Sequence, residues 1–458
     1  MATTTVSIGS NQSIDTETPS GASGSNPYTV TFGTNPNSNV AVGDIMTMDD
    51  SANSGDTIIY LLTGISGSNY TVKWCSGGGS AQSPTDIVDA YGDQEDAVFK
   101  RAFSTITLFE AMIDDSSPSY WGSSDDVVGE LHADSNFTDN TVNFNQKQSL
   151  SSVTLSVYSD DRHDGTAESG ALWKPTSGSG HNVGILVMNV DNMIAEWLDI
   201  SLDSLDSTDT NRAIVLAGTN DDNIIRNSLI HDKGGNPGSS GPAAIQATAA
   251  GGTSDTISIL NNIIYNWVET SNDHTVGINI NQWQGTSYVY NNTVYNIVSN
   301  GGSKYAYGIL FANNSSTTTN IKNNIVAQLS GSQERAYYKN NASSTANTAN
   351  NLSDDTADAA YNAEDMAQNL NDSSALIGKT LAQIDFVSTS AGSEDLHLDT
   401  DSVCLKAGVD LGTINGVNID IDGIDRDATG VTWDIGADQK STADSGSAGK
   451  AFLIFLDI

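Results

Sequence analysis

Two short phrases alternate along the middle of this 458-residue chain, and each recurs after about thirty residues. The first phrase is a small residue followed by a larger one, at Gly184-Ile185, Ala213-Ile214, Ala244-Ile245, Gly277-Ile278, Gly308-Ile309 and Ala336-Tyr337. The second sets asparagine against apolar residues, at Asn227-Ser228, Asn261-Asn262, Asn291-Asn292, Asn323-Asn324 and Asn350-Asn351, with Trp197-Leu198 in that place of the first unit. A fixed period of this size predicts stacked repeats, because one such unit cannot bury an apolar face alone.

The repeating segments have the composition of strands and turns. They are rich in Ile, Val and Tyr and are bounded by Gly, Asn, Ser, Asp and Thr. Between residues 180 and 350 no apolar stripe with a helical period is long enough for a helix. Equivalent strands are therefore expected to pair in parallel around a continuous interior. The asparagines would stack as a ladder of satisfied side-chain amides, although asparagine is also common in turns and the register is open by one residue.

Regions on both sides of the repeat extend the pattern. Upstream, residues 97–113 read as an amphipathic helix, followed by the segment 125–131. Downstream, a closing segment contains residues 395–398, 402–408, 420–423 and 433–437. With the repeat, these segments resemble the right-handed parallel β-helix family, the shape of pectate lyases and phage tailspikes, over about residues 95–440. The pairs that depart from the usual closing residues are Ser402-Val403, Arg426-Asp427 and Asp438-Gln439.

The resemblance implies an all-β fold. It implies a right-handed parallel β-helix with an N-terminal capping helix, and it specifies fold far better than function. Residues 1–92 contain four alternating apolar segments, which predict a small N-terminal β domain for attachment or oligomerisation. We expect the β-helix and its closing segment over residues 93–440. Residues 441–458 would form a spacer and an apolar strand that pairs with a neighbouring chain or with the body of the protein.

The charge of the chain limits its partners. The formal net charge is −38, from 56 acidic and 18 basic residues, and such a surface repels nucleic acid and anionic membranes. Aspartate suits turns, but the shortage of lysine and arginine has no such explanation and favours a marine or salty setting, with bound calcium as the competing reason. The two cysteines, Cys75 and Cys404, are expected to be free and buried.

The N-terminal residues lack the basic start and apolar run of a secretory signal, and no stretch has the length of a membrane helix. Release from the cell by lysis, as for phage virion proteins, would explain this. Type I secretion is the alternative, although its usual glycine-rich calcium repeats are absent. We therefore expect a virion or extracellular location.

Several acidic clusters could carry chemistry. The densest runs from Asp160 to Asp164, and within it Asp161, His163 and Asp164 are the candidate catalytic residues. Paired carboxylates serve glycosidases, and a histidine beside an aspartate can act as a general base. The competing interpretation is that turns in so acidic a chain simply contain aspartate. Further clusters occur at Asp221-Asp222, His231-Asp232-Lys233 and Asp273-His274.

Two binding sites are also candidates. Trp197, Trp267 and Trp283 could stack on sugar rings, or could fill the corners of the coils. Asp420, Asp422 and Asp425 have the alternating spacing of a calcium loop without the glutamate that completes an EF-hand, so no cofactor is required and structural Ca²⁺ is the one considered.

These observations favour a phage virion protein: a spike, fibre or capsid decoration protein that displays a rod for recognition of a host-surface polysaccharide or for particle stabilisation. Its partners would be other virion proteins and copies of itself in a homotrimer. A secreted polysaccharide lyase or glycoside hydrolase is the first alternative, and it requires acidic or basic residues that converge in a groove. A type I secreted adhesin is the second.

Overall fold

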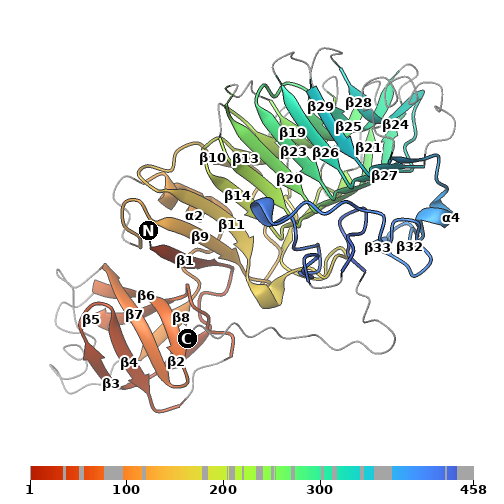
Figure 1. The fold of residues 1–458 in the computed structure, drawn as a ribbon. Helices are drawn as coiled ribbons and strands as arrows, with labels where there is room; N and C mark the ends of the chain where they lie inside the picture. The colour runs from red at the N-terminus through yellow and green to blue at the C-terminus, as the bar shows by residue number, and fades with distance from the viewer. Residues whose placement is uncertain are drawn as a thin grey trace.

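The computed structural model describes residues 2–440 except 35–37, 51–55, 77–95, 116–119, 178–183, 204, 206–211, 219–220, 234–240, 249–251, 253, 270–273, 301–303, 312–316, 341–344, 355–373 and 429–430. Its body is a parallel β-helix, in which three sheets of parallel strands wrap one interior (Figure 1). The prediction of an all-β chain with this fold is confirmed.

Each of the three sheets takes one strand from every complete coil. The first contains β1 (Thr3–Ile8), β9 (Asp126–Leu131), β11 (Ser152–Val157), β14 (Met193–Glu196), β17 (Asn223–Arg226), β20 (Thr256–Leu260), β23 (Thr286–Tyr290), β26 (Thr318–Lys322) and β29 (Thr345–Ala349). The second contains β10 (Val142–Phe144), β13 (Gly184–Met188), β16 (Arg212–Leu216), β19 (Ala243–Ala247), β22 (Thr275–Ile280), β25 (Tyr305–Phe311) and β28 (Gln333–Lys339). The third contains β12 (Leu172–Trp173), β15 (Asp199–Ser201), β18 (Leu229–Lys233), β21 (Ile263–Glu269), β24 (Thr293–Ser299), β27 (Ile325–Ala327), β30 (Leu352–Ser353) and β31 (Leu376–Ile377).

In the interior, residues of the same type stack on one another in successive coils. In the second sheet Ile245 pairs with Ile278, which pairs with Ile309, and all three are fully buried. The isoleucine of the first repeated phrase thus marks one inward position in successive coils. In the first unit the register differs by one residue, because Leu186 and not Ile185 pairs with Ile214.

The asparagine ladder is present, and the structure fixes its register. The second asparagine of each pair points inward: the Nδ2 atoms of Asn262, Asn292 and Asn324 each donate to the Oδ1 of the next copy at 3.0 Å, ending on Asn351. All of these side chains are fully buried. The first asparagine of each pair turns the corner in the left-handed backbone region, with φ of 54° at Asn261 and Asn291.

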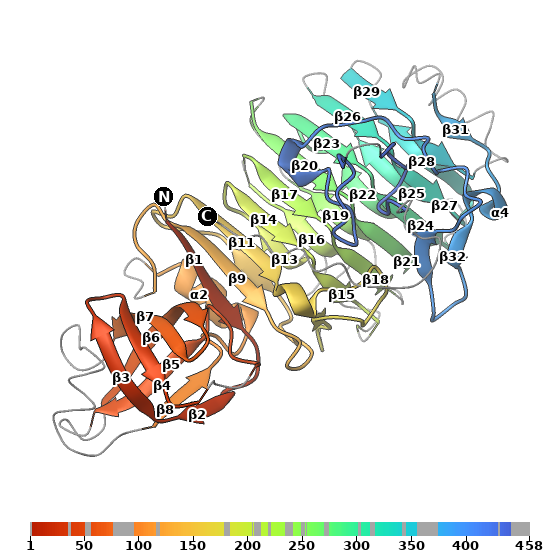
Figure 2. The same cartoon turned by 60° about the horizontal axis from the view of Figure 1, so that its bottom comes forward.

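The closing segment lies along this asparagine corner and runs back towards the N-terminal coils (Figure 2). The side-chain amides of the corner asparagines hold it through its backbone carbonyls. Asn350 donates to Ala407 O at 2.7 Å, Asn323 to Val409 O at 2.8 Å, Asn261 to Ile419 O at 2.6 Å and Asn227 to Ile419 O at 3.0 Å. The segment also includes α4 (Leu381–Ile384), β32 (Phe386–Ser388), β33 (Asp395–Leu398) and the short 3₁₀ turn η2 (Ile414–Gly416). The corner asparagines therefore have two structural roles: they form the turn of each coil, and they bind the closing segment to the coils.

The N-terminal β domain is an antiparallel sheet, and its limits differ from the expected 1–92. In spatial order its strands are β2 (Asp15–Glu17), β8 (Ala97–Lys100), β5 (Ile45–Asp50), β6 (Asp56–Ser66), β7 (Asn69–Ser76), β4 (Tyr28–Phe32) and β3 (Pro19–Gly24). The first strand of the chain, β1, instead pairs in parallel with β9 and extends the β-helix. The helix expected over residues 97–113 is wrong at its start, because Ala97 and Phe99 alternate as buried strand residues.

The helical part of that segment is α2 (Ile106–Ile113), which covers the N-terminal end of the coil stack (Figure 1). Its Phe109 ring lies 6.0 Å from Phe144 and packs over Gly129, where a Cβ atom would come within 2.7 Å of the ring. Glycine at this position lets the helix approach the first coil. Both cysteines are free and buried, as expected. The spacer and strand expected at 441–458 lie outside the described residues, and no helix in the described part of the chain is long and apolar enough to span a membrane.

Candidate functional site

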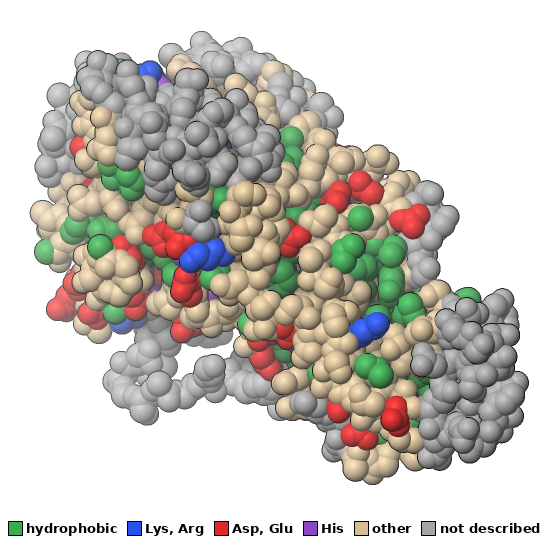
Figure 3. Space-filling model, turned by 180° about the vertical axis from the view of Figure 1, so that it is seen from behind, with side chains coloured by type: hydrophobic (Ala, Val, Ile, Leu, Met, Phe, Trp, Pro, Cys, Tyr) green, Lys and Arg blue, Asp and Glu red, His purple; other side chains and the backbone are tan. Residues whose placement is uncertain are grey.

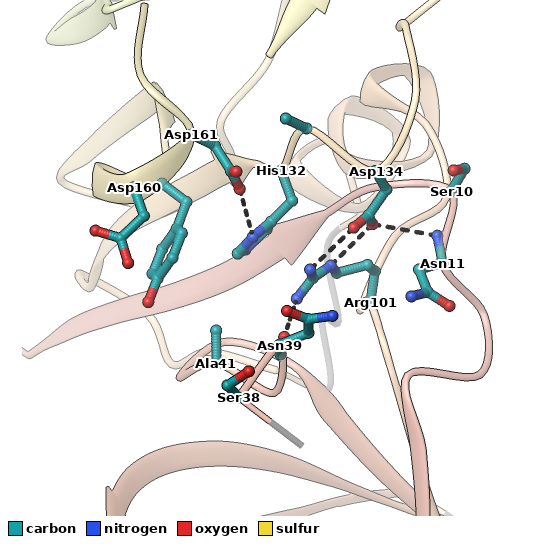
Figure 4. Close-up of a pocket in the computed structure, with 12 residues that line it drawn as sticks. Ser10, Asn11, Ser38, Asn39, Ala41, Arg101, His132, Asp134, Asp160 and Asp161 are labelled. Atoms are coloured by element: carbon teal, nitrogen blue, oxygen red, sulfur yellow. Dashed lines mark hydrogen bonds and ion pairs between the residues drawn. The ribbon is translucent and has the colours of Figure 1, made fainter. Parts of the chain in front are cut away.

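A cavity of about 670 Å³ lies where the N-terminal domain meets the first coils (Figure 4). Three neighbouring parallel strands, β1, β9 and β11, end beside it, and the carboxyl ends of parallel strands meet at one edge of a sheet. The residues after each strand therefore converge, and the N-terminal domain adds the facing wall. The lining residues are Ser10, Asn11, Ser38, Asn39, Ala41, Arg101, His132, Ala133, Asp134, Tyr158, Asp160 and Asp161.

Arg101 joins the two walls of this cavity. Its side chain is 4% exposed, and its Nε and Nη2 atoms bind the two carboxylate oxygens of Asp134 at 2.9 and 3.0 Å. The Nη1 atom donates to Asp44 at 3.0 Å and to Asn39 O at 3.2 Å. A forked guanidinium suits this bidentate contact with a carboxylate. The pair fixes Asp134 at the cavity and ties the N-terminal domain to the β-helix.

His132 forms a second fixed group. Its imidazole is buried, stacks on the Tyr158 ring with centroids 4.6 Å apart, and places Nδ1 3.2 Å from Asp161. Burial alone would raise the pKa of Asp161, but hydrogen bonds from His132 and from the Ala133 amide hold that pKa below its usual range. Asp161 is therefore a stable anion at neutral pH. The second ring nitrogen of His132, Nε2, has no hydrogen-bond partner among the described residues.

The lining is suited to binding a polar ligand. Its volume lies in the range of small-molecule sites, and its carboxylates, amides, guanidinium and phenol match a polyhydroxylated compound. A glycosidase needs one carboxyl group with a raised pKa to protonate the leaving group. The pKa of Asp161 is displaced in the opposite direction. The cavity can thus hold hydroxyl groups, but Asp161 is not placed as the acid.

The three candidate catalytic residues bind different partners. Only Asp161 faces the cavity. His163 is buried, receives the Gly165 amide on Nδ1 at 3.3 Å and therefore donates from Nε2 to Asn227 O at 3.0 Å. Burial lowers its pKa, so it is a neutral structural histidine. Asp164 accepts from the Thr166 hydroxyl at 2.6 Å. The expected cluster is therefore divided between the cavity and a turn.

The expected tryptophan sites need correction. Trp267 and Trp283 are 0% and 2% exposed and belong to the core of the coils. Trp197 is 6% exposed, and the Arg162 guanidinium covers its ring at 4.5 Å. A sugar needs an open aromatic face, which none of the three rings offers. They fill the interior and its corners, the alternative that the sequence left open.

The expected calcium loop is also rearranged. Asp420 is fully buried, and its Oδ1 accepts the amides of Asp422 and Ile424 while Oδ2 accepts the Gln439 amide. Asp425 Oδ1 accepts from Asn418 and from the Asp427 amide. These carboxylates cap turns, and in the described part of the chain the three aspartates do not form a common ligand group.

Sequence reasoning missed Arg101, His132 and Asp134 in the cavity. The expected helix over residues 97–113 concealed Arg101, which directly follows the strand β8. His132 and Asp134 follow β9. Their convergence could be recognised only once β1 and β9 were known to be neighbours, because that pairing joins residues more than a hundred positions apart.

His231 shows a further buried charge cluster, on the third sheet. Its ring nitrogens lie 2.7 Å from Asp199 and 2.8 Å from Asp232, and it stacks on Tyr265 at 5.1 Å. Burial disfavours the charged imidazole, but the two carboxylates outweigh burial and raise its pKa to about 9. With a 1% exposed side chain, this group serves stability and not ligand binding.

This cluster predicts a pH dependence of stability. Because the folded pKa of His231 lies above the ordinary value of 6.5, its contribution is complete below about pH 6.5 and is lost as pH rises to about 9. The difference in unfolding free energy between the wild type and His231→Asn should shrink by about 2–3 kcal/mol from pH 6 to pH 9. Urea unfolding at both pH values measures it. A difference independent of pH would show that His231 is neutral in the fold.

Comparison with solved structures finds two phage tailspikes that align with part of this chain. No protein-family model matches the chain, and no curated protein matches it. The tailspike gp61 of Pseudomonas phage phi297 aligns with 76% of this chain and 61% of its own length, at 11% identity and a TM-score of 0.15. The tailspike gp49 of Pseudomonas phage LKA1 aligns with 76% of this chain and 64% of its own, at 13% identity and a TM-score of 0.15. The chain thus spans less than two thirds of either tailspike. Likeness of this extent carries no functional argument, and the fold assignment rests on the strand pairing itself.

Proposed function

We propose that this chain is a structural protein of a phage virion whose β-helix displays a binding site for a host-surface glycan. A spike, a fibre or a capsid decoration protein could each display such a site. The observation that carries the proposal is the polar cavity at the base of the rod, between the N-terminal domain and the first coils. A rigid rod with a site held by buried ion pairs is suited to repeated attachment, because little conformational entropy is lost on binding.

The chemistry of the lining points to a neutral glycan. Asp134 and Asp160 offer carboxylate oxygens to sugar hydroxyl groups, and the half-buried Tyr158 offers an aromatic ring. An acidic polysaccharide would meet repulsion from these groups and from a molecule of net charge −38. Figure 3 shows acidic side chains along one face, with few basic ones among them.

The same proposal includes the partners. Other virion proteins would hold the N-terminal domain, and a homotrimer would place three rods side by side in the virion or outside the cell. Neither nucleic acid nor membrane is expected to bind so acidic a surface. A secreted polysaccharide lyase or hydrolase would use the same cavity but would release products. A type I secreted adhesin would bind glycans without belonging to a particle.

Binding of neutral oligosaccharides tests the proposal. We expect the full chain to bind at least one neutral oligosaccharide on an array of glucose-, galactose-, rhamnose- and N-acetylhexosamine-containing glycans. Asp160→Asn and Tyr158→Ala should each weaken that binding by roughly tenfold to a hundredfold, the range for loss of a charge-assisted hydrogen bond or a stacking contact. Titration calorimetry measures the change.

Asp401→Asn is the matched control, since it removes the same charge from an exposed residue of the closing segment. It should leave binding unchanged. Absence of binding to every glycan, or binding that the cavity variants do not weaken, would refute the proposal. Release of reducing ends or unsaturated products from the bound glycan would instead establish the enzyme.

A further inference from the structure

A second group of chemically active side chains lies away from the cavity, where the closing segment folds on itself. It contains His397 from β33, Asp422 from the turn at residues 420–425, and Asp438 near the end of the described chain. One ligand atom of each residue lies within 4.8 Å of the corresponding atoms of the other two. Three separate stretches of the closing segment thus deliver an imidazole and two carboxylates to one place.

The imidazole is already oriented as in a metal site. His397 Nδ1 contacts Asp395 Oδ1 at 2.5 Å, and Nε2 lies 3.0 Å from Asp422 Oδ1. Histidines that bind metals generally donate their other ring N–H to a carboxylate, which fixes the tautomer and aims the free nitrogen at the ion. Asp395 is in the position to do this through Nδ1, and the nitrogen that faces Asp422 is Nε2.

Asp438 supplies an independent observation. Its side chain is 5% exposed, and Oδ2 accepts the Leu398 amide at 2.8 Å. Within the described part of the chain, this is the one hydrogen bond on the Asp438 carboxylate. A carboxylate in so buried a side chain with a single hydrogen bond is costly unless a proton or a cation joins it. Because Asp438 belongs to the group with His397 and Asp422, a cation bound by that group would offset this cost.

The neighbouring backbone encloses the group. Gly165 has a φ of 83°, and a Cβ atom there would come within 2.1 Å of His397 Nε2 and 3.2 Å of Asp422 Oδ1. Only glycine allows the chain to pass so close to these two ligands. The site is therefore bounded by the turn after His163 as well as by the closing segment.

We propose that His397, Asp422 and Asp438 bind one divalent transition-metal ion, with Asp395 as the positioning residue for the imidazole. One nitrogen and two carboxylate oxygens suit Zn²⁺, which takes four ligands in a tetrahedron, so that a water would complete the set. Calcium prefers six to eight oxygen ligands and does not favour imidazole. The ion would link β33, the 420–425 turn and residue 438, and so fasten the closing segment to itself.

Zinc titration of the chelated full-length protein tests this site. We expect one Zn²⁺ per chain by calorimetry and by native mass spectrometry, with a higher melting temperature on binding, and Co²⁺ should give the intense visible absorption of a tetrahedral complex. Asp422→Asn and Asp438→Asn should each weaken binding by at least tenfold. Asp395→Asn should weaken it by roughly ten- to a hundredfold while the stoichiometry stays at one, as for other residues that orient a ligand.

The control is Asp425→Asn, which removes an exposed carboxylate of the same turn that is not in the group. It should bind Zn²⁺ as the wild type does. Asp422 is also exposed, so Asp422→Asn remains informative even if the buried Asp438→Asn variant fails to fold. Absence of stoichiometric Zn²⁺, binding that the ligand variants leave intact, or displacement of Zn²⁺ by equimolar Ca²⁺ would each overturn the proposal. The first result would mean that His397 holds a proton between Asp395 and Asp422.

Discussion

Replacement of Asn292 by alanine will destabilise the β-helix by about 3–5 kcal/mol, a loss large enough to unfold a marginal protein. Asn292 sits in the middle of the interior ladder and is fully buried. Its Oδ1 accepts both the backbone amide and the Nδ2 of Asn262, at 3.1 and 3.0 Å. Its Nδ2 donates to Ile259 O at 2.9 Å, Tyr290 O at 3.1 Å and Asn324 Oδ1 at 3.0 Å.

The size of this effect follows from what remains after the substitution. Alanine leaves the buried backbone amide of Asn262 without its acceptor, and it removes one donor each from Ile259 O, Tyr290 O and Asn324 Oδ1. A buried polar group that loses its partner costs about 1–3 kcal/mol, and the lost hydrogen bonds and the space left by the side chain add to that cost. Asn340→Ala is the matched control, because Asn340 is exposed and its side chain makes one hydrogen bond, to Asn281 at 3.1 Å. It should change stability by less than about 0.5 kcal/mol. Urea unfolding measures both variants, and similar values for them would show that the coils stack through their backbones alone.

The ladder was predictable because its chemistry must recur in every coil. An inward asparagine needs a copy above and below, so Asn262, Asn292 and Asn324 appear in the sequence at the period of the fold. The pairing of the first asparagine with the closing segment was not predictable. It joins residues such as Asn261 and Val417, and no local pattern specifies which carbonyl a turn residue will meet.

The prediction that the tryptophans bind sugar rings was wrong for a different physical reason. Strand residues two apart normally share a face, so Trp267 should lie on the same side as Tyr265. Asn266 between them has a φ of 54°, and the residues opposite it in the neighbouring strands, Asp232 and Asn296, have φ of 59° and 54°. All three strands therefore bend at this position without a change of register. The bend turns Trp267 into the interior while Tyr265 stays outside, against His231. A sequence shows that an aromatic residue is present, but the face it takes depends on one backbone angle.

The cavity could not be predicted from the sequence, because its walls come from strands whose pairing is seen only in three dimensions. Its walls come from β1, from the segment after β8 and from the coils that begin at β9. The expected boundary at residue 92 assigned all of the first strand to a separate domain, and so separated Asn11 from Asp134, whose Oδ2 accepts the Asn11 amide at 3.2 Å. The acidic composition predicted carboxylates everywhere and therefore distinguished none of them.

Arg101→Met will cost about 3–5 kcal/mol, because it leaves Asp44 buried without a counter-ion. The Asp44 carboxylate is 0% exposed, and burial raises its pKa while the charge of Arg101 opposes that rise. Removal of one partner of a buried ion pair leaves the desolvation penalty of the other uncompensated. The substitution also frees Asp134 from its bidentate contact, so glycan binding in the cavity should weaken together with stability.

Two comparisons separate the ion pair from the loss of a long side chain. Lys174→Met breaks two solvent-accessible pairs, with Asp203 and Glu168, and should cost less than about 1 kcal/mol. Addition of Asp44→Asn to Arg101→Met should restore part of the lost stability, since the amide carries no charge to be buried. Equal losses for Arg101→Met and Lys174→Met, or no recovery in the double variant, would mean that Asp44 is protonated in the fold. In that case the charge of Arg101 would act on the junction only through its contact with Asp134.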